Sequence, residues 1–233
     1  MPSVKTLDQS LTYVERFIRN SPLTFKNSGE LAFYSADWVK QFILSAPFAW
    51  RWNRGYVPTI NCVKGQQDYQ VNIPDFGWLE RASLNFPVTV GEPAKSIELE
   101  NELVVASEQF SNEPTTITAQ VDDDNGNITF RLFPPPDTDY TLSIIYQKAA
   151  SNFTSLQQTW YPIPDYMSYV YHQGLKALAY EYIDDERFGF ALQFFVQQLV
   201  AANNGLSETE KNIFLEQRMD TLREEVAVKS GRR

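Results

Sequence analysis

Few residues of this chain have the types and spacing that enzyme active sites need. The sequence contains one histidine, His172, and one cysteine, Cys62. A catalytic site usually needs an acid–base group near a nucleophile or a metal ion, and nothing in the spacing of these two residues supports such a pair. His172 lies between Ser168 and Lys176 on one face of an expected helix, so we interpret it as a surface residue. With one residue of each type, a zinc site built from nitrogen and sulfur ligands is not expected.

The densest acidic run of the chain is followed by a turn signal: residues 122–127 read DDDNGN. A calcium loop of the EF-hand type fails here, because with Gly126 at the sixth position the first would be Val121 and the twelfth Leu132, neither of them a ligand. The pair Asn125-Gly126 favours a solvated hairpin turn. Neither a P-loop nor a dinucleotide-binding glycine pattern is present, and no pattern singles out a catalytic pair among the 29 acidic residues. We therefore expect no enzymatic activity, no catalytic residue, no metal and no cofactor.

An aromatic cluster stands out between the expected helices and strands, where residues 48–56 read FAWRWNRGY. Aromatic side chains interleaved with arginine can stack on bases or sugars, or they can seal a joint between elements or subunits. The chain carries 20 Lys+Arg against 29 Asp+Glu, a net charge of −9, whereas proteins that grip the nucleic-acid backbone are usually basic. We therefore predict a subunit interface or helix–sheet interface at Phe48, Trp50, Trp52 and Tyr56.

The elements around these residues follow the order helices, strands, helices, which is typical of α+β proteins. Residues 6–9 have the form of a capping box, and the helical spacing of apolar residues continues to Ile18. A second helix is expected from about residue 30 to residue 45, before Pro47. Its large apolar residues share one stripe: Leu31, Tyr34, Trp38 and Phe42.

Alternation of apolar and polar residues predicts five strands in the middle of the chain, at residues 69–73, 82–86, 117–121, 128–132 and 140–146. Such runs imply antiparallel strands with one buried face. Residues 98–114 are ambiguous between strand and helix. Helical spacing returns after Pro164, an acidic turn at residues 184–186 separates one helix from the next, and a last helix is expected from Ser207 to Val226.

These elements predict the fold class and the domain organisation. We expect an α+β protein in which N-terminal and C-terminal helices form a helical bundle around a central antiparallel β-sandwich or small β-barrel insertion. Residues 1–55 would supply the first helices, residues 56–150 the β domain, and residues 151–233 the last helices and a basic tail. A single cysteine allows no internal disulfide, and we expect neither a signal peptide nor a membrane span.

Four motifs in this order give the chain a resemblance to a known family. They are FAWRW at 48–52, GQQDYQV at 65–71 leading to IPDF at 73–76, LFPPPDTDYTL at 132–142, and WYPIPDY at 160–166 before a helical pair. Together they resemble the head–tail adaptor family of tailed bacteriophages, the tail tubular or gatekeeper-type connectors. The likeness covers roughly residues 30–200.

The resemblance implies a structural virion protein rather than an enzyme. Such a protein is one subunit of an adaptor ring, usually twelve-fold, that joins the portal to the tail and forms part of the DNA conduit. Its partners would be further copies of itself, the portal protein, and a tail or nozzle protein. It would lie in the neck of the virion after assembly in the host cytoplasm, contact no membrane, and let DNA pass without sequence-specific binding.

The resemblance also suggests roles for two sets of residues. A C-terminal segment often extends onto the portal in this family, and the corresponding residues here are Val226, Lys229, Arg232 and Arg233. An acidic channel would repel DNA phosphates and let the genome slide. The densest acidic candidates for such a channel are Asp122, Asp123 and Asp124.

Two other functions stay open on the sequence. A tail-associated or carbohydrate-binding β module would use tryptophans as sugar platforms, with Trp50, Trp52, Trp78 and Trp160 as candidates. A hydrolase would need an acidic pair in a cleft, which the sequence does not identify.

Overall fold

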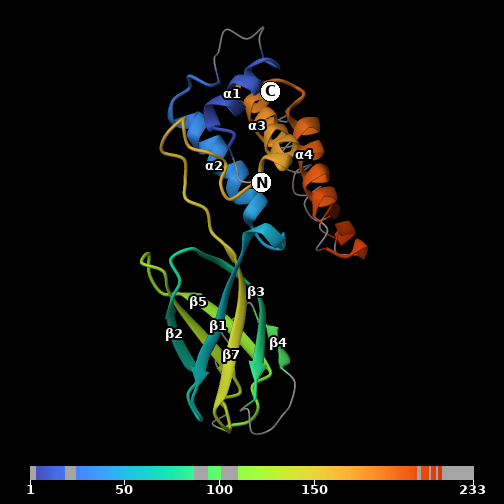
Figure 1. Ribbon diagram of the computed structural model, residues 1–233. Helices are drawn as coiled ribbons and strands as arrows, with labels where there is room; N and C mark the ends of the chain where they lie inside the picture. The colour runs from blue at the N-terminus through green and yellow to red at the C-terminus, as the bar shows by residue number, and fades with distance from the viewer. Residues whose placement is uncertain are drawn as a thin grey trace. The chain divides into compact units, whose positions relative to one another are not determined.

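The computed structural model describes residues 4–18, 25–86, 94–100, 110–203, 206–209, 211–213 and 215–216. The chain divides into two compact units (Figure 1). Met1–Trp50 and Ala150–Arg233 make the first, which we call the helical unit, and Arg51–Ala149 make the second, which we call the β unit.

Helix α3 is the centre of the helical unit. The elements of this unit are α1 (Leu7–Glu15), α2 (Glu30–Leu44), the short 3₁₀ turn η2 (Asp165–Met167), α3 (Ser168–Tyr182) and α4 (Phe188–Ala202). Helix α3 packs against α1, α2 and α4 (Figure 1). Gly174 permits this close packing, because a Cβ atom there would lie 2.9 Å from Val39 Cγ1 on α2 and 3.1 Å from Phe195 Cε2 on α4.

Helix α1 begins as its sequence predicts. The Gln9 backbone N–H donates to Thr6 Oγ1 at 3.3 Å, and the Thr6 N–H donates to Gln9 Oε1 at 3.2 Å. This reciprocal pair is a capping box, and it satisfies two backbone donors that would otherwise lack partners at the start of the helix. Below it, Leu7, Leu11 and Val14 are buried at helical spacing.

The predicted bounds of α2 are confirmed, and its apolar stripe is only partly buried. Tyr34 is 70% exposed and Leu31 is 40% exposed. The buried face consists of smaller residues: Ala32, Ala36, Val39 and Ile43. Val39 meets α3 at Gly174, whereas the rings of Trp38 and Phe42 pack against Phe195 of α4.

The β unit contains one seven-stranded mixed sheet. Its strands are β1 (Arg54–Cys62), β2 (Asp68–Asn72), β3 (Phe76–Asn85), β4 (Lys95–Leu99), β5 (Thr116–Val121), β6 (Asn127–Phe133) and β7 (Tyr140–Lys148), with the 3₁₀ turn η1 (Arg51–Asn53) before β1. Their order is β1-β7-β3-β4-β5-β6-β2. All neighbouring strands are antiparallel except β4 and β5, which pair in parallel at Glu98–Thr116 and Leu99–Ile117.

One hydrophobic core holds the sheet together and curls it nearly into a barrel. Ile60 of β1 and Tyr69 of β2, the two strands at opposite ends of the strand order, are buried in the same cluster. The alternation predicted for β6 is confirmed, because Ile128, Phe130 and Leu132 are all buried while the residues between them are half-buried. A flat sheet would keep its first and last strands apart, so their shared core requires strong curvature.

The predicted fold class, helices forming a bundle around an antiparallel sandwich or barrel insertion, is wrong. The helices pack on one another in a unit of their own, and the sheet is mixed. Two strands, β1 and β4, were not predicted from the sequence pattern. In β1, the register shifts between Val57 and Ile60, which interrupts the two-residue period. In β4, Ile97 is the single buried residue of five. The predicted last helix, Ser207 to Val226, lies largely outside the described residues.

Candidate functional site

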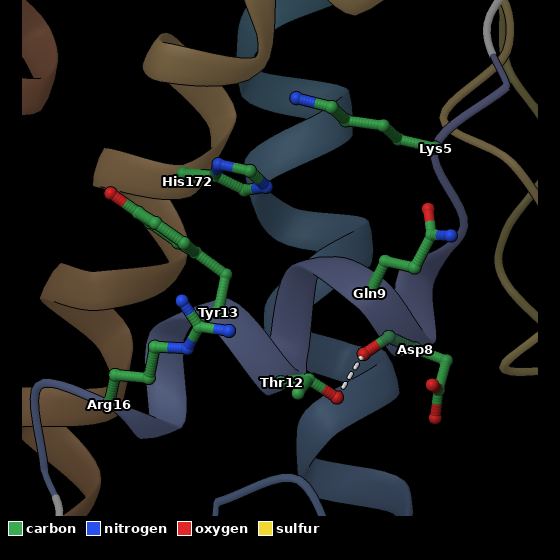
Figure 2. Close-up of a pocket in the computed structure, with 7 residues that line it drawn as sticks. All are labelled: Lys5, Asp8, Gln9, Thr12, Tyr13, Arg16 and His172. Carbon is green, nitrogen blue, oxygen red and sulfur yellow. Dashed lines mark hydrogen bonds between the residues drawn. The ribbon is translucent and has the colours of Figure 1, made fainter.

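The helical unit contains a pocket of about 450 Å³ between α1 and α3 (Figure 2). Most of its wall comes from α1 and the residue before the cap, and one residue comes from α3. We call it the α1–α3 pocket, and its lining residues are Lys5, Asp8, Gln9, Thr12, Tyr13, Arg16 and His172.

The period of α1 places four of these residues in one row. Gln9, Thr12, Tyr13 and Arg16 follow the spacing i, i+3, i+4, i+7, so their side chains leave the same face of the helix. All four are exposed, whereas the opposite face is buried against the unit's core. The capping box that fixes the start of α1 therefore also fixes this row along the pocket.

His172 closes the pocket on the α3 side. Its ring stacks on Tyr13 with the two centroids 4.5 Å apart and the planes inclined by 24°. His172 Nε2 lies 3.2 Å from Ser10 Oγ, which also accepts a hydrogen bond of 2.9 Å from Trp160 Nε1. The Ser10 hydroxyl donates to the Thr6 carbonyl at 3.2 Å. A hydroxyl has one proton to donate, so His172 Nε2 donates to Ser10 in the tautomer that keeps the bond from Ser10 to the Thr6 carbonyl.

The charge state of His172 follows from its surroundings. Burial, and secondarily the positive charge of Lys5, lower the pKa of His172 to about 4, so the ring is neutral at pH 7. The prediction of a surface histidine is wrong, because the ring is half-buried between α1 and α3. Sequence reasoning missed this contact because Ser10 and His172 are 162 residues apart.

The pocket carries a positive charge. Lys5 Nζ donates to Ser168 Oγ at 2.9 Å, and Arg16 is exposed. In the described part of the chain, neither cation has an ion pair with a carboxylate. Asp8, the acidic residue of the lining, is neutralised by Lys26 Nζ at 2.7 Å. The Asp165 carboxylate lies beside the Lys5 backbone, whose N–H donates to Asp165 Oδ1 at 3.1 Å. Cationic side chains such as Lys5 and Arg16 can form charge-assisted hydrogen bonds with an anionic group.

The predicted aromatic interface residues fall in different places. Phe48 and Trp50 are buried in the helical unit, with ring centroids 6.3 Å apart, and Trp50 Nε1 donates to the Ile43 carbonyl at 2.7 Å. Trp52 is half-buried in η1, and Tyr56 on β1 is 63% exposed. Their role in a subunit interface stays a prediction.

The tryptophans also bear on the carbohydrate-binding alternative. Trp50 and Trp160 are buried, so neither presents a face to a sugar. Trp52 and Trp78 are half-buried. A sugar platform needs an exposed ring face, and of the four candidates Trp52 and Trp78 alone have partly exposed side chains.

The predicted acidic residues lie together on the turn between β5 and β6, which we call the acidic turn (Asp122–Asp124). Asp123 Oδ1 accepts from the Asn125 backbone N–H at 2.9 Å, and Asp122 Oδ2 accepts from Thr129 Oγ1 at 2.6 Å. Hydrogen bonds from Asn127 lower the pKa of Asp123. All three residues are exposed, and Asp124 makes no hydrogen bond or ion pair to another residue in the described ranges. The turn is thus held by its own side chains, as a solvated hairpin turn requires.

The remaining candidates do not form a site with one another. Cys62 is buried in the core of the β unit, where burial raises its pKa to about 11, whereas His172 belongs to the helical unit. Within the described ranges, no group of three His, Cys, Asp or Glu residues is placed to hold a metal ion. The predicted portal-docking residues Val226, Lys229, Arg232 and Arg233 lie outside the described residues.

No helix in the part of the chain that the structure describes is long and apolar enough to cross a membrane.

Comparison with known families identifies the kind of protein that carries these features. A family model described as SU10 adaptor protein matches residues 6–224, a range that spans both units. No curated protein matches the chain. The family is one of phage head–tail adaptors, structural proteins located near the head–tail junction of the virion in contact with neighbours such as portal or tail proteins. The predicted kinship is confirmed, and the chain belongs to the SU10 adaptor protein family and is a structural adaptor protein of a bacteriophage.

Proposed function

We propose that the chain forms, with further copies of itself, a ring that joins the portal to the tail and surrounds part of the DNA conduit. The observation that carries the proposal is the family match across residues 6–224, which includes the described elements of both units. Twelve copies are expected from the resemblance to connector rings. Portal protein would contact one side of the ring and a tail or nozzle protein the other, after assembly in the host cytoplasm.

The distribution of charge supports a conduit. The β unit carries 7 Lys+Arg and 14 Asp+Glu, a net charge of −7, whereas the helical unit carries 13 and 15, a net charge of −2. Cations of the β unit are largely used in ion pairs: Arg54 with Glu80, Lys95 with Glu113, Arg131 with Asp68 and Lys148 with Asp75. Unpaired acids such as Asp124 would repel DNA within about 8–10 Å at physiological salt.

Exposed aromatic residues support contacts between subunits. Tyr161, Tyr166, Tyr169 and Phe190 in the helical unit are all more than half exposed. Protein interfaces are enriched in aromatic side chains relative to the rest of the surface. Such residues on a monomer favour assembly with other chains, because burying each ring removes apolar area from water.

A phage that lacks this protein tests the proposal. A nonsense mutation in the gene should yield heads and tails that fail to join, and supplying the wild-type chain in trans should restore infectious particles. Electron micrographs of the lysate give the readout. Complete, infectious virions without the protein would refute the adaptor role.

A further inference from the structure

We propose that the exposed apolar face of α4 binds the C-terminal helix of a neighbouring copy of the chain. The existence of a ring of copies rests on the proposed function. The choice of the two surfaces rests on α4, on the helix that follows it and on their sequences, so the contact and the ring can be tested separately.

Helix α4 packs on α3 with one side and exposes an apolar face on the other. Phe190 is 75% exposed, and Phe194, one turn later, is 41% exposed. Gln197 and Ala201 continue the same exposed row, and none of the 15 residues of α4 is charged. A surface helix usually places charged and polar residues on the side away from the core. Exposed phenylalanines on an uncharged helix therefore indicate a surface that another element covers.

A second helix begins soon after α4 ends. The Leu206 backbone N–H donates to Asn203 Oδ1 at 3.2 Å, and the Lys211 backbone N–H donates to the Ser207 carbonyl at 3.0 Å in the first turn of the new helix. We call the segment 207–226 the C-terminal helix, of which the structure describes residues 207–209, 211–213 and 215–216. The spacing of its apolar residues predicts that it continues to Val226.

The C-terminal helix carries an apolar row that matches the face of α4. Leu215, Met219 and Leu222 follow the spacing i, i+4, i+7, and all the residues between them are charged or polar. Leu215 and Met219 are four positions apart, as Phe190 and Phe194 are, which is about 6 Å along either helix axis. Two apolar contacts can therefore form together when the helices pack side by side.

The described part of the chain's own C-terminal helix leaves the face of α4 open. If this helix folded back over α4 after the link at residues 203–206, Leu215 would lie opposite Phe194, because both are equally far from the middle of the link. Leu215 is among the described residues, yet Phe194 stays 41% exposed and Phe190 stays 75% exposed. The face is thus accessible to a different copy of the chain.

A ring needs the kind of interface that these two surfaces offer. In a cyclic assembly of more than two copies, each copy contacts the next through two different surfaces. The face of α4 and the row of the C-terminal helix are two such surfaces in one chain. Each copy would insert its row against one neighbour and receive the row of the other. Burial of Phe190 and Phe194 in this contact would remove apolar area from water and stabilise the ring.

Cross-linking between full-length chains tests the contact. One chain carries Phe190→Cys and a second, tagged chain carries Met219→Cys, and a bismaleimide that spans one helical turn joins thiols that lie close together. The native Cys62 is buried, and the wild-type chain measures its background. We expect a mixed dimer of tagged and untagged chains, both in concentrated solutions of the chain alone and in mixtures with the portal protein. Gln217→Cys, which helical spacing places on the opposite side from Met219, should give at least tenfold less dimer.

Three results of the cross-linking would overturn the proposal. The first is the absence of the mixed dimer in both mixtures. The second is a dimer of two Phe190→Cys chains in its place, which would show that α4 contacts α4. The third is a link inside single chains that carry both cysteines, which would show that the chain's own C-terminal helix covers α4.

Charge substitutions test the same contact during assembly on the portal. Phe190→Glu and Met219→Glu should each weaken assembly by about tenfold or more, because each places a charge in an apolar contact. Tyr34→Glu is the matched control, since Tyr34 is 70% exposed on α2, and it should leave assembly unchanged. Circular dichroism and melting temperatures are compared first. Equal weakening by Tyr34→Glu would count against α4 as the specific surface and overturn the proposal.

Failure of the contact and failure of the ring give different results. A wild-type chain that forms no complex with the portal would refute the proposed function, and cross-linking of the concentrated chain alone would still decide the contact. A ring that forms on the portal without the mixed dimer would leave the proposed function in place and refute the contact.

Discussion

Lys40 is a charged side chain in the interior of the helical unit, 3% exposed on α2. Its Nζ donates to the Ser151 carbonyl at 3.0 Å and lies 4.5 Å from the centroid of the Phe153 ring. Asp37, one turn earlier, accepts from the Phe153 backbone N–H at 2.7 Å. The two side chains together tie residues 151–153 to α2.

Burial lowers the pKa of Lys40 to about 8, an effect that Asp37 partly opposes. Between about pH 8 and the ordinary pKa of lysine near 10.5, the unfolded chain holds a proton that the folded chain has released. We therefore expect Lys40 to contribute about 1–3 kcal/mol more to the free energy of unfolding at pH 9.5 than at pH 7.5. Cys62 acts in the opposite direction near the upper pH, because its pKa is raised, so the contribution is measured as the difference between the wild type and Lys40→Met in urea denaturation at the two pH values. A difference between the two proteins that does not change with pH would contradict the prediction.

At the pocket, residue types alone gave little information. Gln9, Thr12, Tyr13 and Arg16 resemble any solvated face of an amphipathic helix, and His172 is more than 150 positions away in the sequence. Their meeting depends on the packing of α1 against α3, which no local pattern encodes. The sequence also could not predict that Trp50 and Trp160 are buried, because an aromatic residue suits a protein core and an interface equally well.

At the scale of elements, the turn between β5 and β6 depends on Gly126. Its φ of +82° lies in the left-handed region, and a Cβ atom there would lie 2.4 Å from the Pro74 Cα atom. Gly65 is a natural control, because its φ is +79° but nothing lies within 4 Å of its Cβ position. Gly65→Ala should cost about 1 kcal/mol from backbone strain alone. Gly126→Ala should cost about 1–3 kcal/mol more, because Pro74 must also move.

Equal losses of stability for the two glycine variants, measured by chemical denaturation, would show that the contact between the turn and Pro74 is loose.

The junction of α2, α3 and α4 at Gly174 makes a second prediction. Gly174→Ala places a methyl group 2.9 Å from Val39 Cγ1, so we expect the free energy of unfolding to fall by about 1–3 kcal/mol. Val39→Ala removes the methyl groups that clash. The double variant should therefore lose less stability than the two single losses added together, and strict additivity would contradict this view of the junction.

Elements with a strict period were the ones that the sequence predicted well. Ile128, Phe130 and Leu132 alternate and form β6, and the capping box at Thr6 starts α1. Prediction failed where tertiary packing determines the structure more than the local pattern does. Strand β1 has a register shift after Val57, and β4 buries Ile97 alone. Helix α2 buries its small residues. The predicted antiparallel sheet was also wrong, because the parallel pairing of β4 with β5 cannot be recognised from local sequence.

At the scale of the whole molecule, the C-terminal tail carries a prediction that concerns partners. Val226, Lys229, Arg232 and Arg233 lie outside the described residues and are expected to dock on the portal. Removing residues 226–233 should weaken portal binding by about tenfold or more, without changing the melting temperature of the remaining chain. A variant with Lys229, Arg232 and Arg233 changed to Gln separates charge from length. Unchanged affinity in both variants would contradict the docking role.

Family membership was recognised from motifs whose residues serve the fold in different ways. Phe48 and Trp50 of the first motif are buried, Tyr69 of the second is in the β core, and Trp160 of the last is fully buried beside Tyr171. Residues of this kind characterise the family because they pack its core. For that reason the motifs pointed to the correct family while the predicted arrangement of the helices around the sheet was wrong.

The central claim is that copies of this chain assemble on the portal as an adaptor ring. Light scattering gives the solution mass of the chain alone and mixed with the portal protein of the same phage. We predict one complex whose mass equals the portal ring plus about twelve copies of the 26.8 kDa chain. A chain that keeps its own mass in the mixture, beside an unaltered portal ring, would contradict the claim.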